Sequence, residues 1–223
     1  MRRTSDFNAL RANARAVWAV AILAAATCCL SAAPLATAAA TPAAAASPAA
    51  AGTAQWTLDR LMSTLAHNKS GRASFTETKY LAIADKPIES TGELAFVAPD
   101  HLEKVTVSPK PERLVVDGDK LTVDRNQRKY TVSLAHYPEL AAFIESIRAT
   151  LAGNRYVLEQ LYKVSIGGHG DDWTLTLTPL DSRMLKTVQT IKLDGTRDVL
   201  RTVVIEQADG DHSVMQLRNA SRQ

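Results

Sequence analysis

Cysteine and recognisable catalytic motifs are scarce in this sequence. Cys28 and Cys29 are its only cysteines, and both lie in a segment that we expect to be removed. The remaining protein would then use no disulfide bond. The sequence also contains no G-x-S-x-G motif, no P-loop and no G-x-G-x-x-G motif, which argues against the enzyme classes that carry them.

The five histidines are scattered, without the i, i+4 pair or the cysteine partner that would indicate a zinc site. The nearest grouping is His169 with Asp171 and Asp172, in a glycine-rich stretch that is better explained as a hairpin turn. No nucleophile and base can be assigned together. We therefore predict that the protein is not an enzyme and has no metal and no cofactor. A lipid-processing enzyme stays open as an alternative if the site is polar.

The first 38 residues have the features of a secretory signal peptide. Four arginines lie between positions 2 and 15, an uncharged run follows from Ala16 to Ala40, and Ala36-Thr37-Ala38 has the small residues of a cleavage site. We predict cleavage near Ala38. Two alternatives are a transmembrane anchor, since the uncharged run could span a bilayer, and acylation of Cys28.

Removal of residues 1–38 changes the charge of the protein. This segment holds four arginines and one aspartate, so the formal net charge falls from +3 to zero without it. A neutral domain has no overall electrostatic attraction for nucleic acid or an anionic membrane. Residues 39–54 are Ala, Thr, Pro, Ser and Gly, a composition that predicts a disordered linker.

Most of the remaining chain has the period of β-strands. Between Ala73 and Leu134, apolar residues alternate with polar ones in six short segments separated by turns. Alternation returns after Tyr162 and predicts five more strands. Asp117-Gly118 is expected to form a type I′ turn, and Asp194-Gly195 to separate two of the later strands.

Two segments have the period of amphipathic helices instead. Residues 56–67 begin near a possible cap at Thr57 or Thr53, and residues 138–152 end at Gly153. A further helical turn is possible over 156–161. The predicted fold is mainly β (α+β), with about eleven antiparallel strands and a domain over residues 55–220.

A twisted sheet of that many strands curls, and a barrel wider than about eight strands cannot be filled by its own side chains. We therefore expect an incomplete antiparallel β-barrel whose apolar cavity is covered by a lid of the two helices. The expected cavity residues are Phe75, Leu94, Phe96, Val105, Val107, Leu114, Val116, Val132, Trp173 and Leu175. The expected lid residues are Trp56, Leu61, Leu65, Phe143, Ile144 and Ile147.

From Trp56 to Asn219 the sequence resembles the LolA family of periplasmic lipoprotein carriers. The matching stretches are Phe75-Thr76-Glu77-Thr78, Gly92-Glu93-Leu94 followed by Pro99, Leu114 to Leu121 with Asp124, and Ile191 to Gly195. The resemblance implies an incomplete barrel closed by helices, a cavity for acyl chains, and transport of lipid across the periplasm. In this family a basic residue stands before the proline of the second strand and bonds to the lid. Ala98 occupies that position here, so this contact with the lid is either missing or built differently, and ordinary lipoprotein cargo is in question.

The predicted function is that of a monomeric periplasmic carrier. It would take an acylated lipid or lipoprotein from an inner-membrane exporter and deliver it to an outer-membrane acceptor, without binding nucleic acid. Two alternatives stay open: an envelope-stress sensor or adaptor that binds a protein segment through an edge strand, and an outer-membrane acceptor lipoprotein similar to LolB.

Overall fold

The structure of the chain is a computed structural model that describes residues 55–221. The predicted signal peptide and linker lie outside these residues. The described strands are β1 (Ser70–Tyr80), β2 (Ile88–Val97), β3 (His101–Ser108), β4 (Glu112–Asp117), β5 (Lys120–Arg125), β6 (Arg128–Ser133), β7 (Tyr162–His169), β8 (Asp172–Pro179), β9 (Val188–Thr196), β10 (Val199–Gln207) and β11 (His212–Ser221).

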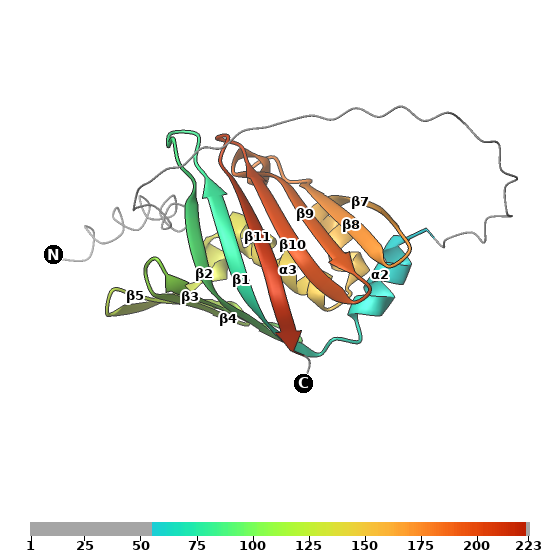
Figure 1. The fold of residues 1–223 in the computed structure, drawn as a ribbon, viewed down its shortest axis with the longest axis horizontal. Coiled ribbons are helices and arrows are strands. Elements are labelled where there is room, and N and C mark those ends of the chain that lie inside the picture. The colour runs from blue at the N-terminus through green and yellow to red at the C-terminus, as the bar shows by residue number, and fades with distance from the viewer. Residues whose placement is uncertain (1–54, 222–223) are drawn as a thin grey trace, which may run out of the picture.

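All eleven strands belong to one antiparallel sheet. Their order is β6-β5-β4-β3-β2-β1-β11-β10-β9-β8-β7, so two meanders, β1–β6 and β7–β11, join where β1 pairs with β11. β6 and β7 are the two edges of the sheet, which curls but does not close (Figure 1). The predicted incomplete barrel of about eleven strands is confirmed.

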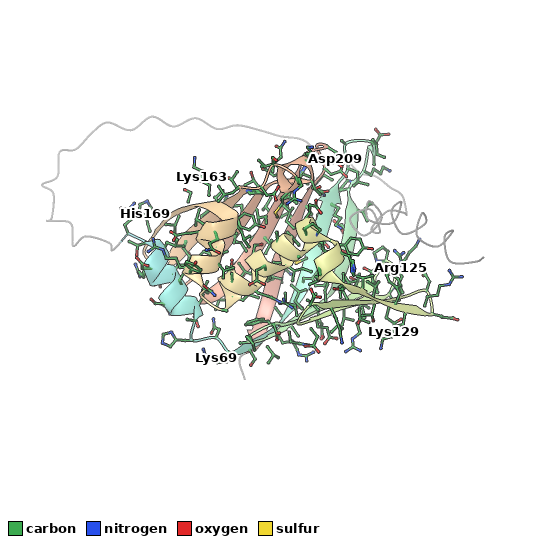
Figure 2. The ribbon with its side chains drawn as sticks, turned by 180° about the vertical axis from the view of Figure 1, so that it is seen from behind. Lys69, Arg125, Lys129, Lys163, His169 and Asp209 are labelled. Atoms are coloured by element: carbon green, nitrogen blue, oxygen red, sulfur yellow. The ribbon has the colours of Figure 1, made fainter. Side chains whose placement is uncertain are left out.

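The helices lie on one face of this sheet, which we call the inner face (Figure 1). They are α2 (Leu58–Leu65), α3 (Pro138–Leu151) and α4 (Arg155–Leu161), with single turns of 3-10 helix at η1 (Leu134–His136) and η2 (Met184–Lys186). Since α3 and α4 connect edge strand β6 to edge strand β7, the chain has to cross the inner face between them. Figure 2 views that side and shows the helices running across it.

Local chemistry explains where the helices begin and end. The side chain of Thr57 accepts a hydrogen bond from the Arg60 backbone N–H at 3.2 Å, so Thr57, one of the two predicted candidates, caps α2. The helix is shorter than the expected 56–67. α3 starts with Pro138 in its first turn and is followed by Gly153 at a φ of 67°. A Cβ at Gly153 would lie 2.2 Å from the Met62 carbonyl oxygen, so this glycine also lets α2 approach closely.

Two hairpin predictions were wrong in detail. At Gly118-Asp119 only Gly118 has a positive φ, which is not type I′ geometry; Asn126 and Gln127, at 52° and 61°, have it instead. Asp194-Gly195 lies inside β9, and the chain turns two residues later, at Arg197 with a φ of 56°. Gly195 is needed within the strand because a Cβ there would lie 2.2 Å from the Trp173 ring.

None of the helices within residues 55–221 combines the length and the apolar character needed to cross a bilayer.

Candidate functional site

One end of the inner face is a closed hydrophobic core. Residues of α2, α3 and α4 pack there on strands β7 to β10, and Leu61, Leu158, Leu175 and Leu177 are all completely buried. This is the most densely covered part of the sheet. We call it the packed half.

A second, smaller cluster lies at the other end of the inner face. Val116, Leu121 and Val123 of β4 and β5 pack against Ile144 of α3. Phe143 of α3 contacts both clusters, so this helix bridges the two ends of the sheet. We call the part of the sheet from β1 to β6 the open half, since α3 is the only α-helix within residues 55–221 that contributes to its cluster, beside Leu134 of the single turn η1.

Between the two clusters lies an apolar strip that belongs to neither. Directly paired residues of antiparallel strands point to the same face, and Phe75 of β1 pairs with Leu217 of β11 and with Gly92 of β2. This register places five apolar side chains together on the inner face. We call them the central strip: Phe75, Leu94, Phe96, Met215 and Leu217.

The cavity residues predicted from sequence fall into three groups. Phe75, Leu94, Phe96, Leu114, Val116 and Val132 are on the inner face, in the central strip or beside it. Trp173 and Leu175 are on the inner face too, but they are buried in the core of the packed half.

Val105 and Val107 make up the third group and lie on the outer face. Leu94 pairs with Lys104 and not with Val105, so β3 turns Leu102, Lys104 and Thr106 inward. Val107 is 62% exposed. The structure therefore separates these two valines from the other eight residues.

The lid residues also divide between two helices. Trp56, Leu61 and Leu65, in and before α2, are buried in the core of the packed half, with Arg60 4.0 Å from the centre of the Trp56 ring. In α3, Ile144 is buried, whereas Phe143 and Ile147 are half-buried. Of the two predicted lid helices, only α3 lies over both halves.

Two polar anchors hold α3 to the sheet. On the packed half, the hydroxyl of Tyr162 donates to the Ala142 carbonyl oxygen at 3.2 Å. On the open half, the guanidinium of Arg148 donates to the carbonyl oxygens of Asp100 and Gly118, at 2.6 and 2.7 Å. These carbonyls belong to the turns before β3 and between β4 and β5. Arg148 therefore connects α3, one of the two predicted lid helices, to two turns of the open half.

A row of charged side chains interrupts the apolar inner face of the open half. We call it the charged belt: Glu77, Lys79, Lys104, Glu112 and Arg125. The Glu77 carboxylate, 5% exposed, accepts a hydrogen bond from Lys104 at 2.6 Å and lies 3.8 Å from the Lys79 ammonium. Arg125 lies 3.7 Å from Glu112.

The charged belt also touches the central strip. The Lys104 ammonium is 4.9 Å from the centre of the Phe75 ring, close enough for a cation–π contact. The Ser90 hydroxyl donates to Glu77 at 3.4 Å on the other side. Charged and apolar surfaces are therefore adjacent on the inner face.

Burial shifts the protonation equilibria of three groups in this belt. It acts to raise the pKa of Glu77, but the positive charges of Lys104 and Lys79, with the hydrogen bonds from Lys104 and Ser90, outweigh it and lower that pKa. Burial lowers the pKa of Lys79 in spite of the nearby Glu77 charge. Burial also raises the pKa of Glu112, against the opposing charge of Arg125. The belt is thus partly removed from water.

Sequence reasoning missed the belt and the Arg148 anchor. Both consist of charged residues in segments where only apolar residues were considered as inner-face candidates. A signal was present in Glu77, which stands two residues after Phe75 and so on the same face of its strand.

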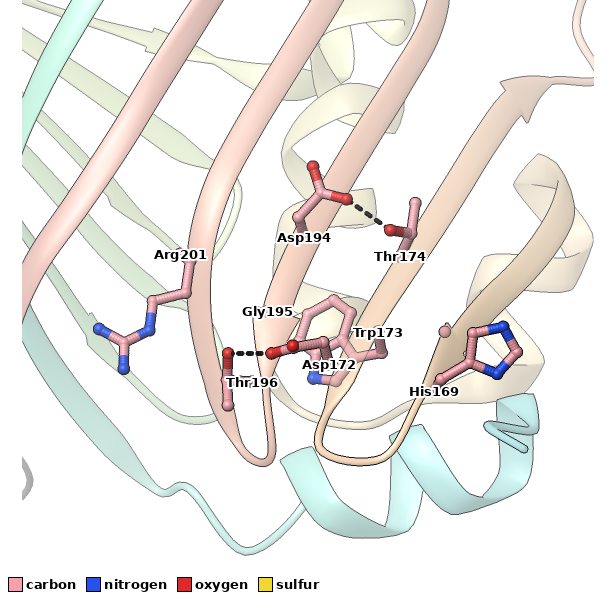
Figure 3. Close-up of a pocket in the computed structure, with 9 residues that line it drawn as sticks. His169, Asp172, Trp173, Thr174, Asp194, Gly195, Thr196 and Arg201 are labelled. Atoms are coloured by element: carbon pink, nitrogen blue, oxygen red, sulfur yellow. Dashed lines mark hydrogen bonds between the residues drawn. The ribbon is translucent and has the colours of Figure 1, made fainter. Parts of the chain in front are cut away.

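A hollow of about 410 Å³ lies on the outer face of the packed half (Figure 3). Its two carboxylates are engaged by neighbouring threonines, with Thr174 donating to Asp194 at 2.5 Å and Thr196 to Asp172 at 2.7 Å. His169 and Arg201 stand at its margins. Across residues 55–221 no three His, Cys, Asp or Glu side chains come together as metal ligands, in this hollow or elsewhere.

Comparison with known proteins gives one family and several similar folds. A family model described as "Outer membrane lipoprotein carrier protein LolA-like" matches residues 33–223. No curated protein matches the sequence.

Three solved structures illustrate the similarity in fold. A LolA superfamily protein from Nitrosomonas europaea is 12% identical, with a TM-score of 0.43 over 74% of this chain and 91% of that one. Lipoprotein LppX from Mycobacterium tuberculosis is 12% identical, with a TM-score of 0.41 over 72% and 91%. MucB in the Pseudomonas aeruginosa MucA/MucB complex is 15% identical, with a TM-score of 0.39 over 74% and 55%.

Proposed function

The chain belongs to the family of LolA-like outer membrane lipoprotein carrier proteins, and on this basis we propose that it is a non-enzymatic periplasmic carrier of acyl chains. Its cargo would be an acylated lipid or lipoprotein, bound between the inner face of the sheet and helix α3. A donor at the inner membrane would load it and an acceptor at the outer membrane would unload it.

The observation that carries this proposal is the central strip. Phe75, Phe96 and Leu217 are at most 9% exposed, while Leu94 and Met215 are half-buried, although none of the five belongs to either hydrophobic cluster. An apolar surface that lies beneath a helix but outside the packed cores is suited to bind a hydrocarbon chain. The chain would replace contacts between this surface and the helix. Burial of each chain methylene would contribute about 0.8 kcal/mol.

Helix α3 would be the part that moves. It contacts the packed half through Phe143 and Ala149, and the open half through Ile144 and the two hydrogen bonds of Arg148. Breaking those two bonds would free its contacts with the open half while the packed half stays folded. Cargo transfer would follow the relative affinities of donor, carrier and acceptor.

Phe96 and Val97 provide a matched test on adjacent residues. Phe96 points to the inner face and Val97, 49% exposed, to the outer face. We expect Phe96→Glu to abolish transfer of a fluorescent acyl lipid between vesicles, because a carboxylate would then lie where the chain binds. Val97→Glu adds the same charge and should transfer at the wild-type rate.

Because Phe96 is buried, its variant must be shown to be folded by circular dichroism. Leu94→Gln, at a half-buried position of the same strip, provides a second variant with a smaller folding risk. Mass spectrometry of gently purified wild-type protein should find a bound acyl species. An empty protein that exchanges no lipid, or equal transfer by the Phe96 and Leu94 variants and the wild type, would contradict the proposal.

A further inference from the structure

The charged belt lies on the inner face beside apolar side chains, and its Lys104 contacts Phe75 of the central strip. Five ionisable side chains from β1, β3, β4 and β5 point to the inner face, where Lys104 is paired with Leu94 and Leu114. The polar residues Ser90, Thr106 and Arg128 pair with Glu77, Glu112 and Arg125. A sheet that only needed a core at this place would be more stable with apolar side chains, because withdrawing charges from water is costly. The belt therefore suggests a polar ligand group on the inner face.

The balance of charge in the belt favours an anion. It contains three cations, Lys79, Lys104 and Arg125, and two carboxylates, Glu77 and Glu112. Lys104 is already hydrogen-bonded to Glu77. Lys79 and Arg125, the other two cations, do not donate a comparable hydrogen bond to a carboxylate within residues 55–221.

Lys79 and Arg125 keep donor capacity. Their ion pairs, at 3.8 and 3.7 Å, are longer than hydrogen bonds, and neither side chain donates a hydrogen bond to any residue among positions 55–221. Their side chains are 23% and 28% exposed, so an incoming group can still reach them. A lysine and an arginine in this state can bind a phosphate or carboxylate through charge-assisted hydrogen bonds.

The belt also lies at the end of the site that α3 leaves uncovered. Glu112 is the first residue of β4 and Arg125 the last of β5, whereas Gly118, which Arg148 holds, is in the turn at the opposite end of these strands. An amphiphile with its chain on the central strip would thus have its headgroup at the accessible end.

We propose that the charged belt binds the headgroup of an anionic lipid, a phosphate monoester in the simplest case, while the acyl chain lies on the central strip. This inference rests on the proposed carrier function and deepens it, because it names the headgroup chemistry of the cargo. The cationic atoms that would contact the headgroup are Nζ of Lys79 and the guanidinium nitrogens of Arg125. Lys104 would keep Glu77 neutralised beside them.

The test compares two probes with the same hydrocarbon chain. Oleoyl lysophosphatidic acid carries a phosphate and monooleoylglycerol does not. By isothermal titration calorimetry of the full chain, we expect the phosphate-bearing lipid to bind about tenfold more tightly, because a charge-assisted hydrogen bond contributes at least that factor. Inorganic phosphate alone should bind much more weakly than either lipid.

The variants assign the preference to the belt. Arg125→Gln and Lys79→Gln should each reduce the tenfold preference several-fold and leave the affinity for monooleoylglycerol unchanged. Lys129→Gln is the matched control. Lys129 is an exposed residue of β6 that pairs with Asp124 of β5. Because Asp124 precedes Arg125 in the strand, Asp124 and Lys129 both point to the outer face. It should retain the full preference.

Each other outcome contradicts a particular claim. Equal affinity for the two lipids, or a preference that persists in both belt variants, overturns the headgroup inference and leaves the carrier proposal intact. Inorganic phosphate that binds as tightly as the lipid overturns the assignment to a lipid headgroup. Failure of the wild type to bind either lipid overturns the carrier proposal and this inference with it.

Discussion

The two halves of the sheet place their inward side chains in very different surroundings. In the packed half, Leu175 and Leu177 of β8 are completely buried and Ile191 of β9 is 2% exposed. In the open half, the inward residues of β3 are Leu102, Lys104 and Thr106, and all three are half-buried. The same strand period thus builds a large buried core where three α-helices cover the sheet. In the open half it builds a smaller buried cluster beside a partly accessible surface.

The difference lies in the helices and in the residues beneath them. α2, α4 and part of α3 pack on β7 to β10, with Trp56 and Leu158 closing that end. Over the open half, α3 is joined only by Leu134 of η1 among the buried helical residues within 55–221, and it is held by Ile144 and by the two hydrogen bonds of Arg148. Stability should therefore be concentrated in one half and ligand response in the other.

The largest effect should come from a cavity in the packed half. Leu175→Ala removes a completely buried side chain and should lower the free energy of unfolding by about 3 to 5 kcal/mol. Leu94→Ala is the matched change in the open half and should cost distinctly less, because Leu94 is only half-buried. Urea unfolding of both variants measures the difference. Equal losses of unfolding free energy in the two variants would contradict the proposed difference in stability between the halves.

An intermediate effect is expected for the buried carboxylate of the charged belt. Glu77→Gln keeps an oxygen that can accept a hydrogen bond but removes the negative charge that Lys104 pairs with at 2.6 Å. It should cost about 2 to 3 kcal/mol at neutral pH, less than for a fully buried pair because Lys104 is partly exposed. Thermal unfolding monitored by circular dichroism measures this loss.

The Glu77→Gln variant also tests how the stability of the protein depends on pH. The pKa of Glu77 is lower in the folded protein than the ordinary value of 4.5, so the unfolded chain binds more protons in this range. The stabilisation by Glu77 is then present above about pH 4.5 and is lost as the pH falls through the lower folded pKa. Wild type should lose stability on acidification more steeply than Glu77→Gln. Parallel pH profiles would show that Glu77 is not responsible.

The smallest effect on stability should come from the anchor of α3. Arg148→Met removes two hydrogen bonds to backbone carbonyls and should cost about 2 kcal/mol. It should also speed lipid exchange between vesicles and increase amide hydrogen exchange in α3, without raising exchange in β8. Glu145→Gln, which removes only a 3.8 Å ion pair to Arg148, is the control and should leave both rates unchanged. Equal acceleration of exchange in both halves would mean that α3 does not open separately.

Much of the fold could be predicted from the sequence. The strand period over 73–134, the helical period over 138–152 and the return to strands after Tyr162 correspond to β1–β6, α3 and β7–β11. These signals are local, since each depends on side chains within a few residues of one another. The predicted turn at Asp194-Gly195 failed because Gly195 is required by Trp173, a residue of the neighbouring strand.

The site was less predictable, for a reason that β3 illustrates. Its sequence alternates, but the more apolar positions, Val105 and Val107, face outward, and Lys104 faces inward opposite Leu94. Alternation gives the period of a strand without saying which set of residues faces the core. A shift of one residue in the pairing exchanges the two sets.

The sequence by itself therefore determined the kind and order of the elements, because backbone and side-chain periods are local properties. Only the tertiary structure decided which residues share the inner face, because that depends on the register of strands far apart in the chain, such as Phe75 with Leu217. It also decided that Arg148 would anchor α3 and that five charged residues would form one belt. These contacts join segments that no local pattern connects.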